Sequence, residues 1–220
     1  NARLENGAEE TVHQDFIINA HTGAVIKQWN SLRTADAVGT GNSQYSGVVS
    51  INTNTVAGGF EMRDMTRGTG GTFGNNVVTN LNHATSGNGT IFTDADNTWG
   101  DGLNYKESPE PTTSANGQTA GVDAHFGIMS TWDYYKLVLG RNGIDGTGQS
   151  SYIRVHYSNN YDNAFWSDAC FCMTFGDGSS FTTLTSMDVA GHEMSHGVCA
   201  TTADLIYSGE SGGLNEANSD

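Results

Sequence analysis

Positive charge is scarce in this chain. Its 220 residues include 9 Lys and Arg against 24 Asp and Glu, a formal net charge of −15. Nucleic acid and anionic membranes are bound through clusters of basic side chains. The sequence contains no such cluster, so we expect neither partner. The acidity allows two interpretations: a solvated surface, or carboxylates that hold Ca²⁺, a cation that selects oxygen ligands.

Long apolar runs and proline are also missing. No run of 18 apolar residues occurs, which predicts no membrane-spanning helix. Only 2 prolines stand beside 29 glycines, a composition typical of loops and strands, not of long helices. No signal peptide is visible, but the chain begins at Asn1 instead of Met. We therefore expect a partial sequence, and the missing signal is no evidence for the cytoplasm.

Cysteine is limited to Cys170, Cys172 and Cys199. An odd number fits one disulfide plus a free thiol in an exported protein, or three thiols in a cytosolic one. Cys170 and Cys172 alternate along a predicted strand over 169–175, so their side chains should point to opposite faces and a bridge between them would be strained. Cys199 either pairs with one of them or is a buried small hydrophobe.

The first 34 residues differ from the rest. Residues 15–20 and 24–29 are predicted strands joined by a turn over 21–23, that is, a hairpin. Two strands alone are marginal in water, so we expect partners upstream of Asn1. The small, polar, Gly-containing residues 34–42 have the composition of a linker or cleavage site.

Short alternating runs separated by Gly and Asn fill residues 45–116. They are typical of an antiparallel, twisted sheet, with strands predicted at 48–53, 60–64 and 76–79. Alternation returns at 151–158.

Helical patterns occupy three segments. Apolar residues follow helical spacing over 121–140, where Gly140 is a plausible stop. A second helix is predicted from an N-cap at Ser186 to about Thr201, with Asp188 in its first turn. Residues 213–220 look like the opening turns of a third helix that the sequence cuts off.

The second predicted helix carries the sequence HEMSH, from His192 through Glu193 to His196. Residues four apart share a helical face, roughly 5–6 Å between Cβ atoms, so both imidazoles can reach one ion. Zinc suits imidazole, and a catalytic site takes three protein ligands plus water. Glu193 projects beside the metal, where it can act as general base.

The motif alone is only moderately specific, because a helix with two surface histidines has the same pattern. Gly191 and Gly197 flank it, although each costs about 1 kcal/mol relative to Ala in a helix. Such a cost suggests close packing or a functional demand.

A third ligand is available in the last predicted helix. Glu216 lies 20 residues after His196, enough for one helix to end and a second to return a carboxylate. Asp220, on the same face as Glu216, is placed to accept the other N–H of a ligating histidine. The alternative for both is an exposed acidic face.

Taken together, these motifs resemble the thermolysin family of zinc endopeptidases over roughly residues 36–220. The matching segments, in order and spacing, are 122–125 (VDAH), 134–135 (YY), 163–166 (NAFW), 176–178 (GDG), 188–197 (DVAGHEMSHG), 205–207 (LIY) and 211–220 (SGGLNEANSD). The combination is highly specific. The resemblance implies an α+β fold: a β-rich antiparallel N-terminal domain followed by a central zinc-binding helix, here truncated.

The resemblance also implies roles for individual residues. His192, His196 and Glu216 would bind zinc, Glu193 would be the general base, and Asp220 would orient His192.

Three further roles concern substrate. Tyr207 would help stabilise the tetrahedral oxyanion. Asn163 and Ala164 would hold the substrate backbone as an added strand, while Phe165 and Trp166 are mostly core aromatics; a plain turn with core aromatics is the alternative for this segment.

Calcium is implied at two places. Asp188 matches a family ligand of a site behind the zinc helix, and its alternative is a helix-start carboxylate. Asp94 and Asp96 resemble a peripheral calcium loop in which Thr98 stands where a further oxygen ligand is expected. An Asx-rich turn is the alternative there.

By the same resemblance, residues 1–34 are the C-terminal tail of a propeptide, with cleavage near 34–37. Residues 35–187 form the β-rich N-terminal peptidase domain, and residues 188–220 the zinc-binding helix and the start of a C-terminal helical domain. That domain, which supplies a transition-state histidine and much of the specificity pocket in the family, is expected beyond Asp220.

The expected function is that of a secreted, extracellular, monomeric zinc metalloendopeptidase made as a zymogen, with its propeptide as intramolecular inhibitor and chaperone. It would cut internal bonds of protein and peptide substrates before bulky apolar residues. Two alternatives stay open: a metal-binding or catalytically inactive module in which the same ligands only brace the fold, and an incomplete piece that does not fold stably.

Overall fold

The computed structural model describes residues 2–4, 12–30, 36–106 and 110–220. The chain forms two compact units, residues 1–35 and 36–220. The smaller unit is an antiparallel sheet in the order β1 (Ala2–Leu4), β2 (Val12–Ile18), β3 (Val25–Asn30). The predicted hairpin is confirmed. β1 lies within the chain and gives the hairpin a third strand by pairing with β2; partners upstream of Asn1 stay a prediction.

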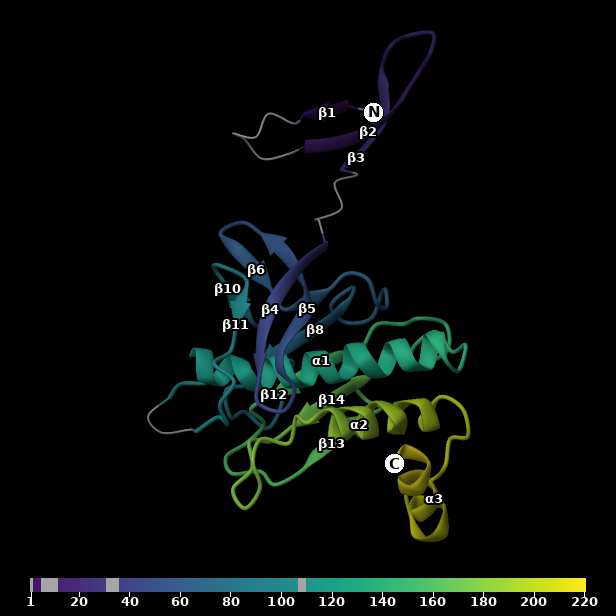
Figure 1. Cartoon of the computed structure of the whole chain (residues 1–220). Coiled ribbons are helices and arrows are strands. Elements are labelled where there is room, and N and C mark those ends of the chain that lie inside the picture. Colours follow the sequence, from purple (N-terminus) through teal and green to yellow (C-terminus); the bar gives the residue numbers. More distant parts are fainter. Residues whose placement is uncertain (1, 5–11, 31–35, 107–109) are drawn as a thin grey trace. The chain divides into compact units, whose positions relative to one another are not determined.

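One sheet of the larger unit has the order β10-β6-β5-β4-β11 (Figure 1). Its strands are β4 (Asp36–Ser43), β5 (Gly47–Val56), β6 (Gly59–Glu61), β10 (Thr93–Asp94) and β11 (Thr98–Trp99). The linker prediction is wrong for residues 36–42, which belong to β4. Its glycines are packing residues: a Cβ on Gly39 would lie 2.4 Å from Asn97 Oδ1, and one on Gly41 2.6 Å from Val122.

The second sheet has the order β13-β14-β12-β8-β7, with β9 paired to β8. Its strands are β7 (Arg63–Asp64), β8 (Asn76–Asn80), β9 (Thr90–Ile91), β12 (Tyr152–Val155), β13 (Ala164–Ser167) and β14 (Cys172–Phe175). β12 runs parallel to both β8 and β14, whereas the other pairs of this sheet are antiparallel. The long connection from β8 to β12 permits this parallel pairing. β13 lies at the edge.

The expectation that Cys170 and Cys172 point to opposite faces is wrong, whereas the alternative of a buried, unpaired Cys199 is confirmed. Cys170 and Cys172 form a disulfide, with Cα atoms 5.2 Å apart, while Cys199 is free and buried. The strand begins only at Cys172, and Cys170 lies in the turn before it. The alternation assumed from the sequence therefore does not apply, and the two side chains can meet.

Helix α1 (Ala115–Leu137) begins six residues before the predicted start at 121. Its first turns are buried among polar partners, so they lack an apolar stripe. Asn116 donates to the Leu103 and Asn104 carbonyls, and a Cβ on Gly117 would lie 2.1 Å from the Thr112 carbonyl oxygen. Periodicity is therefore a poor guide to this start, since it detects one-sided burial only.

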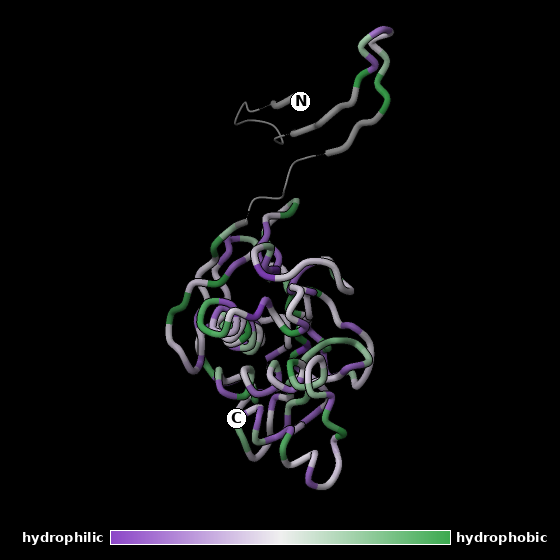
Figure 2. Tube along the Cα trace, turned by 90° about the vertical axis from the view of Figure 1, so that its right-hand side faces the viewer, coloured by the Kyte–Doolittle hydropathy of each residue, from purple (hydrophilic) through white to green (hydrophobic). Residues whose placement is uncertain are grey.

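Helices α2 (Met187–Ala200) and α3 (Gly209–Ser219) follow. The predicted extent of α2 is confirmed, and Ser186 takes the N-cap position, although its side chain makes no capping hydrogen bond. α3 begins four residues before the predicted position. α2 packs against α1 on one side and α3 on the other (Figure 1). None of the described helices has the length and apolar character needed to span a membrane. Figure 2 likewise shows hydrophobic and hydrophilic residues interleaved along the described trace.

Asp123 of α1 is a buried carboxyl whose stability contribution depends on pH. It accepts hydrogen bonds from Ser43 Oγ and Gln44 N, but its Oδ2 has no partner. Burial raises its pKa to about 6. The folded state prefers the protonated Asp123 carboxyl. Its contribution to the free energy of unfolding is therefore fully present below pH about 4 and is lost as the pH rises through about 6.

We therefore expect Asp123→Asn to raise the free energy of unfolding by about 1–3 kcal/mol at pH 8 and to bring no gain near pH 4. Urea unfolding at both pH values measures this, with the exposed Asp204→Asn as control. An equal effect of Asp123→Asn at both pH values would contradict it.

Candidate metal centre

Helix α2 brings the two motif histidines together. The His192 and His196 ring centroids are 4.5 Å apart, as the four-residue spacing predicts. Both side chains, with Glu193 between them in sequence, line an open cleft of about 600 Å³.

Helix α3 returns Glu216 to the same point. Its Oε2 lies 3.1 Å from His192 Nε2, and its Oε1 lies 3.7 Å from His196 Nε2. One ligand atom from each of the three residues falls within 4.8 Å of the others, and no other His, Cys, Asp or Glu triplet in the described part of the chain meets this condition.

The Nδ1 atoms of both imidazoles contact side-chain oxygen atoms. His192 Nδ1 lies 2.9 Å from Asp220 Oδ1, and His196 Nδ1 lies 2.7 Å from Asn215 Oδ1. A proton on each Nδ1 satisfies these contacts. The Nε2 lone pairs then converge with a carboxylate, an arrangement that could hold a cation and suits zinc.

Glu193 occupies a different environment from Glu216. Only 5% of it is exposed, and its Oε2 has no hydrogen-bond partner. Burial raises its pKa to about 7, while His192 and the backbone N–H of Trp166 act in the opposite direction. The result is a buried carboxyl beside the three converging residues, in the lining of the cleft.

One wall of the cleft is the sheet edge at β13. Asn163, Ala164 and Trp166 line it. Since β13 pairs only with β14 among the described strands, its outer edge is open to an added strand.

Tyr207 lies across the cleft and is exposed. Its hydroxyl donates to Glu216 Oε1, and its ring lies 5.9 Å from that of His196. The phenol is therefore near His196, and its hydroxyl is turned toward Glu216.

Close packing accounts for the glycines that flank the motif. A Cβ on Gly197 would lie 2.8 Å from Ile144 and 2.9 Å from Trp166, and one on Gly191 would lie 3.3 Å from Thr131. Side chains of neighbouring elements occupy the space that a larger residue would need.

The calcium candidates do not gather three acidic ligands. Asp94 accepts from the backbone N–H groups of Asp96 and Asn97 and from Gln118, and Asp96 accepts from Thr98 N. Asp188 is exposed in the first turn of α2. Calcium at these positions stays a prediction.

The sequence did not single out the partners of His196. Asn215 and Ser219, whose Oγ lies 3.1 Å from His196 Nδ1, are both buried. Their spacing of four on α3 was the available signal, since it places them on one face of the helix.

Comparison with known proteins agrees with this geometry. A family model described as the thermolysin metallopeptidase catalytic domain matches residues 38–200. The chain is 51% identical to a transglutaminase-activating metalloprotease of Streptomyces mobaraensis, over 98% of this chain and 25% of that protein. It is 37% identical to a bacillolysin of Brevibacillus brevis, over 93% of this chain and 34% of that protein.

A solved structure is also similar. The precursor of protealysin, a metalloproteinase from Serratia proteamaculans, aligns with a TM-score of 0.52 and 28% identity, over 69% of this chain and 42% of that one. The described chain thus has a thermolysin-like α+β fold. It spans 25% and 34% of the length of the two relatives above. Because the family match runs through the β-rich sheets and the whole of α2, this chain belongs to the thermolysin family of metallopeptidases.

Proposed function

We propose that this chain supplies the metal-binding part of a zinc metalloendopeptidase that hydrolyses internal peptide bonds. The observation that carries the proposal is the convergence of His192, His196 and Glu216 within 4.8 Å, next to the buried carboxyl of Glu193, whose Oε2 has no hydrogen-bond partner. A metal site that only stabilised the fold would need the three ligands but not the Glu193 carboxyl, and a carboxyl oxygen is costly to bury without a partner.

His192, His196 and Glu216 hold the ion, and Asp220 and Asn215 fix the orientation of the two imidazoles. A zinc ion in this position supplies Lewis-acid chemistry, polarising a carbonyl and making water reactive near neutral pH.

Glu193 takes a proton from the attacking water and later passes it to the leaving amine. Its free Oε2 is the acceptor, and the dry site strengthens the interaction. Tyr207 turns its hydroxyl from Glu216 to the oxygen of the tetrahedral species, where a phenol donor stabilises developing negative charge.

The substrate binds as a strand along the free edge of β13. Backbone groups of Ala164 and the side chain of Asn163 hold it next to the metal. Main-chain pairing of this kind is independent of side chains, so the preference for bulky apolar residues after the cut bond belongs to other parts of the cleft.

Residues 1–34 are proposed as the end of a propeptide, residues 35–187 as the N-terminal peptidase domain, and residues 188–220 as the zinc helix and the start of the helical domain. A precursor among the similar structures supports the propeptide. A similar protein of Staphylococcus epidermidis, 33% identical over 94% of this chain and 38% of that protein, is named an extracellular elastase, which supports secretion. Calcium at Asp188, Asp94 or Asp96 belongs to the same proposal.

Metal removal tests the function. The full-length protein treated with a zinc chelator is expected to lose hydrolysis of an internally quenched peptide and to regain it when zinc is added back. Zinc content by mass spectrometry and peptide cleavage are measured on the same samples. Activity that persists in zinc-free protein would rule out the proposal.

Asn215→Ala is expected to weaken zinc binding about 10–100-fold, because residues that orient a metal ligand contribute that much to affinity. Competition with a zinc indicator measures it. The control is Asn218→Ala, an exposed residue on the same helix. Equal zinc affinity in the two variants would contradict the role of Asn215.

A further inference from the structure

The disulfide lies in the turn that joins β13 to β14, the hairpin that forms the cleft wall. Ser167 and Cys172 are the last paired residues of the two strands, and Cys170 lies in the turn between them. The bridge therefore closes the hairpin at its tip, around the single residue Phe171.

Phe171 has an unusual backbone conformation for a bulky residue, with φ at +52°. Such conformations persist only where the surroundings hold them. The disulfide links the residues on both sides of Phe171. In addition, the backbone N–H of Phe171 donates to the Asp168 carbonyl at 3.3 Å, and the Phe171 carbonyl accepts from Ser151 Oγ at 2.9 Å.

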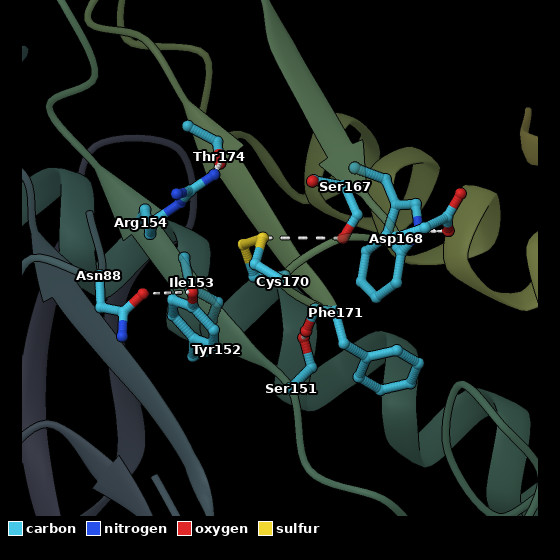
Figure 3. The surroundings of a disulfide bond; sticks show 12 residues. Asn88, Ser151, Tyr152, Ile153, Arg154, Ser167, Asp168, Cys170, Phe171 and Thr174 are labelled. Atoms are coloured by element: carbon cyan, nitrogen blue, oxygen red, sulfur yellow. Dashed lines mark hydrogen bonds between the residues drawn. A yellow bond between two sulfur atoms is a disulfide. The ribbon is translucent and has the colours of Figure 1, made fainter. Parts of the chain in front are cut away.

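In this conformation, the disulfide and the Phe171 ring point in opposite directions. The cysteines pack with Val77 and Tyr152, whereas the Phe171 ring packs against the main core. Figure 3 shows the sulfur atoms and the Phe171 ring on opposite sides of the turn. The Phe171 ring meets the Trp166 indole edge-on, with the ring centroids 5.1 Å apart.

Trp166 connects the turn to the metal centre. Its indole lies against α2 at Gly197, where an added Cβ would be 2.9 Å away. Its Nε1 donates to Asp168 at 2.6 Å, and Trp166 and Glu193 line the same cleft. Movement of the Phe171 ring would therefore be transmitted through the Trp166 indole to α2, the helix that carries Glu193.

We propose that the Cys170–Cys172 disulfide and Phe171 are positioning elements for Glu193, acting through Trp166. The inference rests on the proposed peptidase function. On this proposal, the hairpin tip controls the rate of the chemical step without contributing to zinc binding. The hydrogen bonds, ion pairs and ring contacts of His192, His196 and Glu216 in the described chain involve no residue of 168–172.

The test uses the zinc-loaded, full-length protein. In the double variant Cys170→Ala/Cys172→Ala, kcat is expected to fall about tenfold, because small misplacements of catalytic groups are costly. KM should change by less than about twofold, and the zinc content should stay the same. Phe171→Ala should give the same fall with the disulfide intact, and Phe171→Tyr, which keeps the ring, should restore kcat. Cys199→Ala is the cysteine control.

Reduction of the wild type is the second arm, and it does not depend on the folding of a variant. A water-soluble phosphine gives the disulfide two electrons. With water, the products are two thiols and the phosphine oxide. The reduced wild type should match the double variant in kcat, whereas the double variant itself should not respond. Thiol counting on denatured, unreduced protein should find Cys199 alone among these three cysteines.

The outcomes separate the two proposals. An inactive, zinc-loaded, oxidised wild type would overturn the peptidase function and this inference with it. An active wild type whose kcat is unchanged by reduction and by Phe171→Ala would overturn the inference alone. Zinc could be lost together with kcat, or Phe171→Tyr could fail to restore kcat. Either result would show that the hairpin tip has only a structural role and would overturn the inference.

Discussion

Glu193→Gln is expected to lower kcat/KM for peptide hydrolysis about 10³-fold, within the range that general-base catalysis contributes. Glutamine keeps the shape of the side chain and an acceptor oxygen, but it cannot take a proton from water. Glu193 lies next to His192 in the chain and is not among the three converging ligands. The variant should therefore retain zinc, so the loss should appear in kcat.

The measurement is steady-state cleavage of a quenched peptide by the full-length protein, with zinc determined on the same preparation. Glu210→Gln makes the same change at an exposed position in the first turn of α3 and should leave kcat unchanged. If Glu193→Gln kept wild-type activity, another group would be the base. If the wild type bound zinc but cleaved nothing, the three ligands would only brace the fold.

His196→Ala is expected to remove most of the bound zinc and to lower activity by about 10³-fold or more. A site with three protein ligands loses its geometry when one is removed, and the transition-state stabilisation supplied by the metal is lost with it. His196 also joins α2 to α3 through Asn215 and Ser219, so we expect the variant to unfold at a lower temperature.

Zinc per chain, counted by mass spectrometry, checks this result, with about one ion expected in the wild type. The exposed His21→Ala, in the smaller unit, is the matched control. Full zinc content in His196→Ala would exclude the ligand set, whatever the activity.

Local patterns predicted much of the fold. Alternation found the hairpin of β2 and β3 and, in the larger unit, the segments that form β5 to β8, β12 and β14, and the start of α2 followed from Ser186. These predictions succeeded because each depends on neighbours in sequence. The first turns of α1 were missed because their polar residues are buried by distant segments, for example Asn116 by residues 103 and 104. Residues 36–42 were taken for a linker because the partners of their glycines are equally distant.

By itself, the sequence determined the approach of His192 and His196, because a helix fixes residues four apart on one face. Together with the motifs around it, that pair also determined the family. Only the tertiary structure decided that Asn215 contacts His196, that Trp166 fills the space at Gly197, and that Cys170 joins Cys172. The first two contacts join elements far apart in the chain, and the third depends on where a strand begins. Such contacts are set by packing, which no local pattern encodes.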